Sequence, residues 1–240
     1  ITNTNLPLDT IEALAWASSP DWGYNKHPPF SAFVVGVVYF IFGANDWAYY
    51  FVSQIFVLVA FLYIWKLSKE FFSGDLLPVL SVMILESIVF FNYTTPEFNV
   101  YVCSLPFKAL TVYFFWKSFK SNKLNDWLLT GFYSAIGLLT HYSFLFLILG
   151  LFIFFIISKK NIFIIRNFTL SFLLFFSICL PHLVWLFDNN FITISYALGR
   201  TGVEFKNWID HLYNPIIFLF KQFGMILFFV LIFLSIYSFN

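Results

Sequence analysis

The chain has 240 residues, of which 60% are hydrophobic and only 10% are charged. A soluble domain carries about a quarter charged residues, so this composition excludes a soluble globular protein and indicates a multi-pass membrane protein. The formal net charge of +1 argues against electrostatic binding of nucleic acid. The sequence begins at Ile1 and ends beside an apolar run, and we expect it to be part of a longer protein.

Long apolar segments recur along the chain, and a helix that spans a bilayer needs about 20 such residues. The stretch 127–157 is too long for one span and is interrupted by polar residues at 140–142, so we predict two short helices joined by a tight turn. The fold class is therefore all-α, a bundle of about seven transmembrane spans over residues 48–240. The other spans are predicted at 48–66, 76–93, 98–117, 162–187 and 215–237.

The basic residues indicate which ends of these spans face the cytoplasm. Eight of the 13 fall in three short connections, which the positive-inside rule makes cytoplasmic. Alternate crossing then places residues 1–47, the turn at 94–97, the turn at 140–142 and a long loop over 188–214 on the outer side. The eight residues are Lys66, Lys69, Lys117, Lys120, Lys123, Lys159, Lys160 and Arg166.

Residues 1–47 are predicted to form an external segment that lies against the membrane. The apolar stretch 30–42 is too short to cross comfortably, follows two prolines and precedes Gly43. We therefore expect a helix lying in the outer interface with its apolar face in lipid. The acids, histidine, lysine and aromatic residues that precede it make this segment the expected place for chemistry.

Asp9 and Glu12 are the first candidates. If their stretch is helical, the two carboxylates are three residues apart and share a face. Paired carboxylates can divide general-base and orienting roles. The alternative is a helix start in which Asp9 is the cap and Glu12 completes a capping box.

Lys26 and His27 stand next to Pro28 and Pro29, and a stiff loop could present both cations to a phosphate. Tyr24 is a natural anchor at the level of the lipid headgroups. The alternative is an ordinary aromatic-belt loop in which Lys26 only snorkels to the interface.

Other polar residues lie at the predicted outer turns or inside spans. Glu97 could orient a substrate or cap the helix that follows it. His141 and Arg200 lie in outer turns, where Arg200 could meet a phosphate. Glu86 and Lys108 stand inside spans, where charges are rare, and we predict an ion pair between them. That pair supports an alternative function, a transporter or lipid-handling protein without covalent chemistry.

Several short motifs occur in an order that resembles the glycosyltransferases that use polyprenyl-phosphate-linked sugars. The chain is similar to the branch related to protein O-mannosyltransferases and lipid A aminoarabinose transferase, over roughly residues 6–200, without that family's first span and C-terminal half. The chain departs from the pattern at Thr10, the family's second acid; at Lys26, where relatives often carry an acid associated with metal binding; and at His141, usually Lys. The matching elements are Asp9, Trp16, Asp21–Tyr24, His27-Pro28-Pro29, Phe42-Gly43, Thr95-Pro96-Glu97 and Gly137–Tyr142.

The resemblance implies a GT-C fold and an inverting transfer of a hexosyl or pentosyl group at the outer face of a bacterial plasma membrane. An acceptor hydroxyl on a lipid, glycan or protein would attack the anomeric carbon, and the lipid phosphate would leave. Asp9 would act as base, with Glu12 assisting, and a divalent metal is compatible with the family. The residues implied for binding the donor, its phosphate or the acceptor are Tyr24, Lys26, His27, Glu97, His141 and Arg200.

Overall fold

A computed structural model describes residues 5–158, 162–201 and 208–238. Within these ranges every regular element is a helix, so the predicted all-α class holds. Two helical stretches, Asp46–Ser68 and Ile165–Asp188, are long and apolar enough to cross a membrane. The elements are α1 (Leu8–Ala17), α2 (Phe30–Phe42), α3 (Asp46–Ser68), α4 (Leu76–Glu86), α5 (Val89–Asn92), α6 (Val100–Ser121), α7 (Leu124–Thr140), α8 (Phe144–Ile157), α9 (Ile162–Asp188), α10 (Ile192–Thr201) and α11 (Asp210–Ser238).

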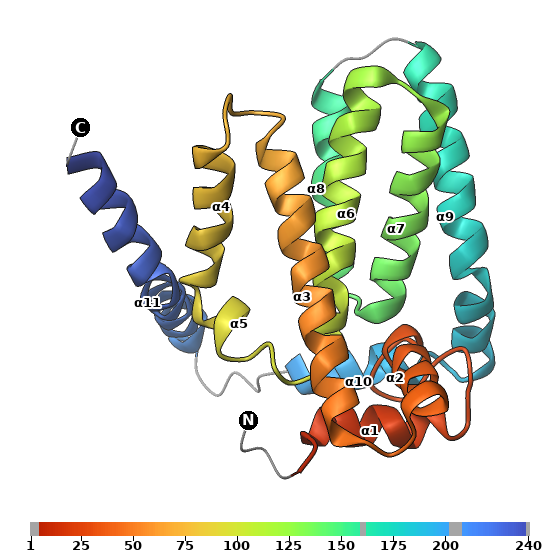
Figure 1. The fold of residues 1–240 in the computed structure, drawn as a ribbon. Coiled ribbons are helices and arrows are strands. Elements are labelled where there is room, and N and C mark those ends of the chain that lie inside the picture. The colour runs from red at the N-terminus through yellow and green to blue at the C-terminus, as the bar shows by residue number, and fades with distance from the viewer. Residues whose placement is uncertain (1–4, 159–161, 202–207, 239–240) are drawn as a thin grey trace.

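The centre of the molecule is a helical bundle in which α6 packs between α3 and α7, and α9 packs on α7 (Figure 1). Small side chains bring these helices close together, as in many membrane bundles. A Cβ atom added at Gly131 on α7 would lie 2.2 Å from the Ser171 carbonyl oxygen of α9. The close approach of α7 and α9 therefore depends on the missing side chain at Gly131.

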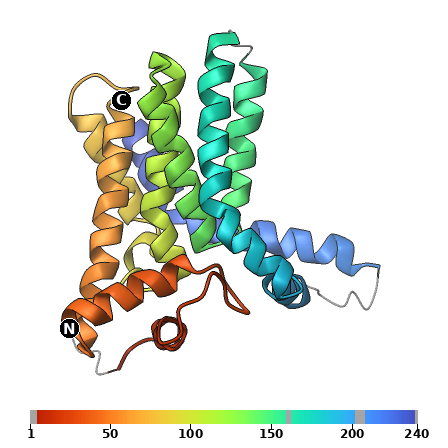
Figure 2. The same cartoon turned by 90° about the vertical axis from the view of Figure 1, so that its right-hand side faces the viewer.

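α1, α2 and α10 lie across one end of this bundle rather than along its axis (Figures 1 and 2). The predicted helix over 30–42 is confirmed: α2 starts directly after Pro29 and ends before Gly43, whose φ of 68° is a conformation that favours glycine. Its location in a membrane interface stays a prediction.

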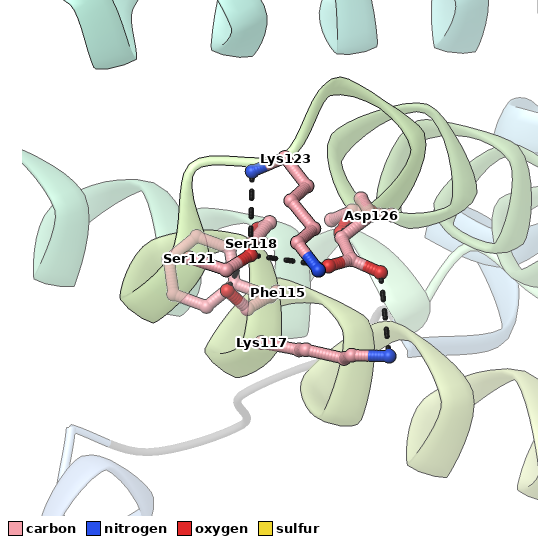
Figure 3. A network of polar contacts seen from close by, with 7 residues as sticks. Phe115, Lys117, Ser118, Ser121, Lys123 and Asp126 are labelled. Atoms are coloured by element: carbon pink, nitrogen blue, oxygen red, sulfur yellow. Dashed lines mark hydrogen bonds and ion pairs between the residues drawn. The ribbon is translucent and has the colours of Figure 1, made fainter.

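The opposite end of the bundle carries the lysine-rich connections between α3 and α4 and between α6 and α7 (Figure 1). Figure 3 shows the second of these closing around Asp126, whose Oδ1 lies 3.6 Å from Lys117 Nζ and whose Oδ2 accepts a hydrogen bond of 3.1 Å from Ser121. Lys120 pairs with Glu70 at 2.9 Å and so joins the two connections. Two of the predicted basic connections therefore share one end, opposite α1 and α2.

The predicted span over 76–93 is wrong as a single helix. α4 ends at Glu86, and a separate short α5 starts at Val89. The predicted ion pair between Glu86 and Lys108 is also wrong, because the ion pairs of the described residues do not include it. The physical reason is that α4 packs on α3, and α3 separates it from α6.

The turn predicted at 140–142 is confirmed, since α7 ends at Thr140 and α8 starts at Phe144, with His141 in extended backbone (φ −162°) between them. The loop predicted over 188–214 is wrong in part, because α10 occupies Ile192–Thr201. Apolar and polar residues are mixed within these ten positions, so the segment lacks the continuous apolar run that marks the spanning helices.

Candidate active site

A narrow cavity lies at the end of the bundle where α1 crosses the beginnings of α2 and α6. Its volume of about 20 Å³ leaves room for roughly one water molecule or one hydroxyl group. Both acids that sequence reasoning singled out face it. The lining residues are Asp9, Glu12, Ala13, Trp16, His27, Ser31, Phe98, Asn99 and Val100.

α1 presents Asp9 and Glu12 on one face, as their spacing predicts. The capping-box alternative is not observed, because the helix follows Pro7 and has no side-chain cap. Between the two acids, the buried Thr10 hydroxyl donates a hydrogen bond of 2.8 Å to the Phe98 carbonyl oxygen. This bond fixes α1 against the turn that leads into α6, and so fixes the two carboxylates.

The two acids differ in their partners. Lys26 Nζ lies 2.7 Å from Glu12 Oε1, and both side chains are about 30% exposed (30% and 31%). The hydrogen bond to Glu12 raises the pKa of Lys26, which therefore stays charged. Among the described residues the exposed Asp9 carboxylate has no ion pair or hydrogen bond, which leaves it accessible to an incoming group.

Two histidines from distant parts of the chain meet beside the cavity. The ring of His27 lies 5.5 Å from that of His141, measured between centroids, and 6.0 Å from that of Trp16. Burial lowers the pKa of each histidine to about 4, so both are neutral near pH 7. The charge of Arg200 on α10 also contributes, less than burial, to lowering the pKa of His27.

His141 has its tautomer fixed by the backbone. Its Nδ1 accepts a hydrogen bond of 3.1 Å from the Ser143 amide, which assigns the proton of the neutral ring to Nε2. The Tyr101 ring lies 4.8 Å from the His141 ring on another side. His141 therefore offers an N–H donor beside the cavity rather than a cation.

Tyr24 holds the loop that carries Lys26 and His27. Its ring stacks on Trp16 at 5.1 Å, and its hydroxyl donates to the Trp16 carbonyl oxygen (3.0 Å) and accepts from the Asp21 amide (3.2 Å). Because its hydroxyl is bonded to Trp16 of α1 and to Asp21 of the loop, Tyr24 holds this loop against α1.

α9 and α10 clamp the same loop from outside. His182 Nδ1 donates to the Trp22 carbonyl oxygen at 2.6 Å, and its Nε2 accepts from the Tyr142 hydroxyl at 2.8 Å. Trp185 Nε1 donates to Asp21 Oδ2 at 2.8 Å, and Thr193 donates to the Tyr24 carbonyl oxygen at 2.6 Å. Sequence reasoning missed Trp185 and Thr193, because nothing local to either residue marks it as a partner of a loop 160 or more positions earlier.

Three of the eight residues assigned from sequence line the cavity, namely Asp9, Glu12 and His27, and the other five do not, namely Tyr24, Lys26, Glu97, His141 and Arg200. Glu97 is exposed, and Asn99 rather than Glu97 caps α6, accepting from the amides of Tyr101 and Val102 at 3.0 Å each. Arg200 is exposed near the end of α10. The described residues contain no group of three or more histidine, cysteine or acidic side chains that could hold a metal ion.

Comparison with known families gives one match. The sequence model described as dolichyl-phosphate-mannose-protein mannosyltransferase matches residues 26–185, which is 160 of 240 residues or two thirds of the chain. The chain belongs to this mannosyltransferase family. Neither the curated proteins nor the solved structures give a match.

Membership in the mannosyltransferase family implies a membrane glycosyltransferase that takes its sugar from a polyprenyl-phosphate donor. The matched range includes Lys26, His27 and His141, whereas Asp9 and Glu12 precede it. The family therefore supports the chemistry, and the roles of the two acids rest on their place in the cavity.

Proposed function

We propose that this protein transfers a sugar from a polyprenyl-phosphate donor to a hydroxyl of a lipid, glycan or protein acceptor, with inversion at the anomeric carbon and with Asp9 as the general base. The observation that carries the proposal is the single cavity that Asp9 and Glu12 share with His27. This cavity brings together carboxylates that can activate an acceptor hydroxyl and a loop that can bind a phosphate. The loop residues Lys26 and His27 lie within the range that the family model matches.

The chemistry follows from the partners of each group. The acceptor hydroxyl gives its proton to Asp9 while its oxygen bonds to the anomeric carbon, and the bond from that carbon to the phosphate oxygen breaks. Glu12 holds Lys26 at 2.7 Å and so orients a cation toward the site. The volume of about 20 Å³ suits the reacting hydroxyl alone, which leaves the rest of the acceptor outside the cavity.

The phosphate side of the site comes from His27, His141 and Arg200. A neutral histidine can donate an N–H hydrogen bond to a phosphate oxygen, and the negative charge of the donor phosphodiester favours protonation of the ring. Arg200, whose charge reaches His27, would bind the phosphate from α10. Glu97, exposed on the turn before α6, would contact the acceptor, and Tyr24 would keep the loop in place.

We place this site on the outer, periplasmic side of a bacterial plasma membrane and the chain in the branch similar to the lipid A aminoarabinose transferase. The lysine-rich connections at the opposite end of the bundle support this side through the positive-inside rule. The motif order supports this branch. Thr10 stands where the family has its second acid, and Glu12 would substitute for that acid. Cell-envelope glycans or lipopolysaccharide are the corresponding acceptors.

The test is release of sugar from dolichyl-phosphate mannose and related polyprenyl-phosphate donors by the full-length protein in membranes, comparing wild type with Asp9→Asn. We expect turnover to fall by a factor of about 100 or more, the usual contribution of a general base. Asp46→Asn is the matched control, since Asp46 is an exposed acid in the first turn of α3. Equal turnover in Asp9→Asn and wild type, at equal abundance, would refute the role of Asp9.

A further inference from the structure

Lys108 on α6 is a cation without a counter-charge. It is half-buried in the bundle, and among the described residues it makes no ion pair or hydrogen bond. An unpaired charge inside a membrane bundle is costly and usually functional. The paired lysines of the described part of the chain are Lys26 with Glu12, Lys69 with Asp75, Lys117 with Asp126 and Lys120 with Glu70.

Helix geometry directs the Lys108 side chain toward the candidate site. Lys108 follows Tyr101 by seven residues, or two turns, so the two lie on one face about 10 Å apart along the axis. Side chains on a helix lean toward its N-terminus, which for α6 is the end that lines the cavity. The long lysine side chain therefore covers much of the distance to the level of Tyr101.

A series of ring contacts connects Tyr101 to the cavity. The Tyr101 ring lies 4.8 Å from the His141 ring, and the His141 ring lies 5.5 Å from that of His27, which lines the cavity with Asp9 and Glu12. The charge of Lys108 also contributes, after burial and His27, to lowering the pKa of His141. Lys108 is thus linked to the site through His141.

The other basic side chains near the site are paired, neutral or exposed. Lys26 is held by Glu12 at 2.7 Å, and burial keeps His27 and His141 neutral, since the pKa of each is about 4. Arg200 is exposed on α10. A leaving lipid phosphate gains negative charge as its bond to the sugar breaks, and a cation positioned in a water-poor site stabilises that charge most effectively.

We propose that Lys108, with the His141 N–H, binds the phosphate group of the lipid-linked donor from inside the bundle, opposite Asp9. This rests on the proposed function and assigns the two sides of the reaction. The acceptor approaches from the Asp9 side, its proton passes to that carboxylate, and the phosphate leaves as a lipid phosphate paired with the Lys108 ammonium.

The experiment measures binding of dolichyl phosphate to the purified full-length protein in lipid nanodiscs. We compare wild type with Lys108→Gln, Lys108→Met and Lys108→Arg, and use Lys120→Gln, a lysine at the other end of the same helix, as control. Loss of a charge-assisted contact should weaken binding about 10- to 100-fold in the Gln and Met variants. Lys108→Arg should restore most of it, and Lys120→Gln should bind like wild type.

Three other ligands, each measured in the same binding assay, show which part of dolichyl phosphate Lys108 recognises. Dolichol tests the chain without the phosphate, inorganic phosphate tests the group without the chain, and phosphatidylglycerol tests an ordinary anionic lipid. The difference between wild type and Lys108→Gln should be large only for dolichyl phosphate. An equal loss for dolichol or phosphatidylglycerol would refute a donor-phosphate site.

Thermal unfolding separates binding from structural support. Removing an unpaired, half-buried charge should leave the ligand-free midpoint of Lys108→Met unchanged or higher, whereas a lysine needed for folding would lower it. If the wild type binds dolichyl phosphate and Lys108→Gln and Lys108→Met bind it equally well, this inference is refuted but the proposed function is not. No binding of dolichyl phosphate by the wild type counts against both.

Discussion

Lys26, on the loop before α2, pairs with Glu12 of α1, Nζ to Oε1 at 2.7 Å. The pair joins the loop before α2 to α1, and it separates the tasks of the two acids that face the cavity. Glu12 is committed to a cation, whereas Asp9 is open to a substrate. We expect the substitutions Glu12→Gln and Lys26→Gln to have the same effect on activity, because each removes the same ion pair.

Each of these two variants should lower kcat/KM roughly tenfold, and the double variant should be little worse than either, because partners of one interaction are not additive. Stability should change by less than about 1 kcal/mol, since both side chains are about a third exposed. Transfer assays on the four proteins of the double-mutant cycle provide the measurement. Additive losses would show that Lys26 and Glu12 work independently.

Thr10 makes the buried hydrogen bond that docks α1 against the Phe98 carbonyl oxygen. Thr10→Val keeps the shape and leaves that oxygen without its donor, which should cost about 1–3 kcal/mol. Turnover should fall too, because Asp9 is the preceding residue. Thr10→Ser retains the hydroxyl and should stay near wild type. The measurement is the thermal unfolding midpoint of each variant in detergent. An unchanged midpoint for Thr10→Val would mean that α1 is held mainly by other contacts.

Gly131 allows α7 to approach α9. In Gly131→Ala the new methyl group would lie 2.2 Å from the Ser171 carbonyl oxygen, a backbone atom that cannot move aside alone. Overpacking of this kind costs about 1–3 kcal/mol. Gly150→Ala is the control, because nothing lies within 4 Å of its added Cβ, and it should be neutral or slightly stabilising. Comparable unfolding midpoints for the two variants would contradict the packing seen here.

The two histidines make stability depend on pH. Burial lowers the pKa of His27 and of His141 from 6.5 to about 4, so the folded state binds fewer protons than the unfolded state between these values. Their stabilising contribution is therefore complete above about pH 6.5 and is lost as the pH falls toward 4. Glu12, Lys26 and Arg200 also act on His27, and Lys108 on His141, with smaller effects than burial.

The measurement for this pH dependence is thermal unfolding at about pH 7.5 and about pH 5, on either side of the ordinary histidine pKa. The midpoint of the wild type should fall at the lower pH. In the double variant His27→Asn, His141→Asn that fall should be smaller, because these two groups no longer titrate. An equal fall in both proteins would assign the acid sensitivity to other groups.

Composition and local spacing were sufficient to predict much of the fold. The α2 boundaries follow from Pro29 and Gly43, and the break between α7 and α8 follows from polar residues inside an apolar run. The interruption of α4 at Glu86 was not predicted, although the polar pair Glu86-Ser87 stands at the break, because Glu86 was interpreted as a charge inside one continuous span. α10 was missed because ten residues of mixed character resemble a loop.

The candidate site was predictable in its acids but not in its partners. Asp9 and Glu12 are local to one another, so helical spacing places them together. The pairing of Glu12 with Lys26, and the approach of His27 to His141, join segments that only the tertiary fold brings into contact. The expected pair of Glu86 and Lys108 failed for the same reason, since α3 separates their helices.

The hydrogen bond from Thr193 to the Tyr24 carbonyl oxygen joins residues 169 positions apart, and that from His182 to Trp22 spans 160. A ribosome makes the chain from its N-terminal end, so the loop with Lys26 and His27 is synthesised long before the residues that clamp it. The acidic and basic residues of the site are therefore not yet held together while the intervening helices are being synthesised. Enzymatic competence should arise late in biosynthesis, only after α9 and α10 have been made and have packed against the loop that carries Lys26 and His27.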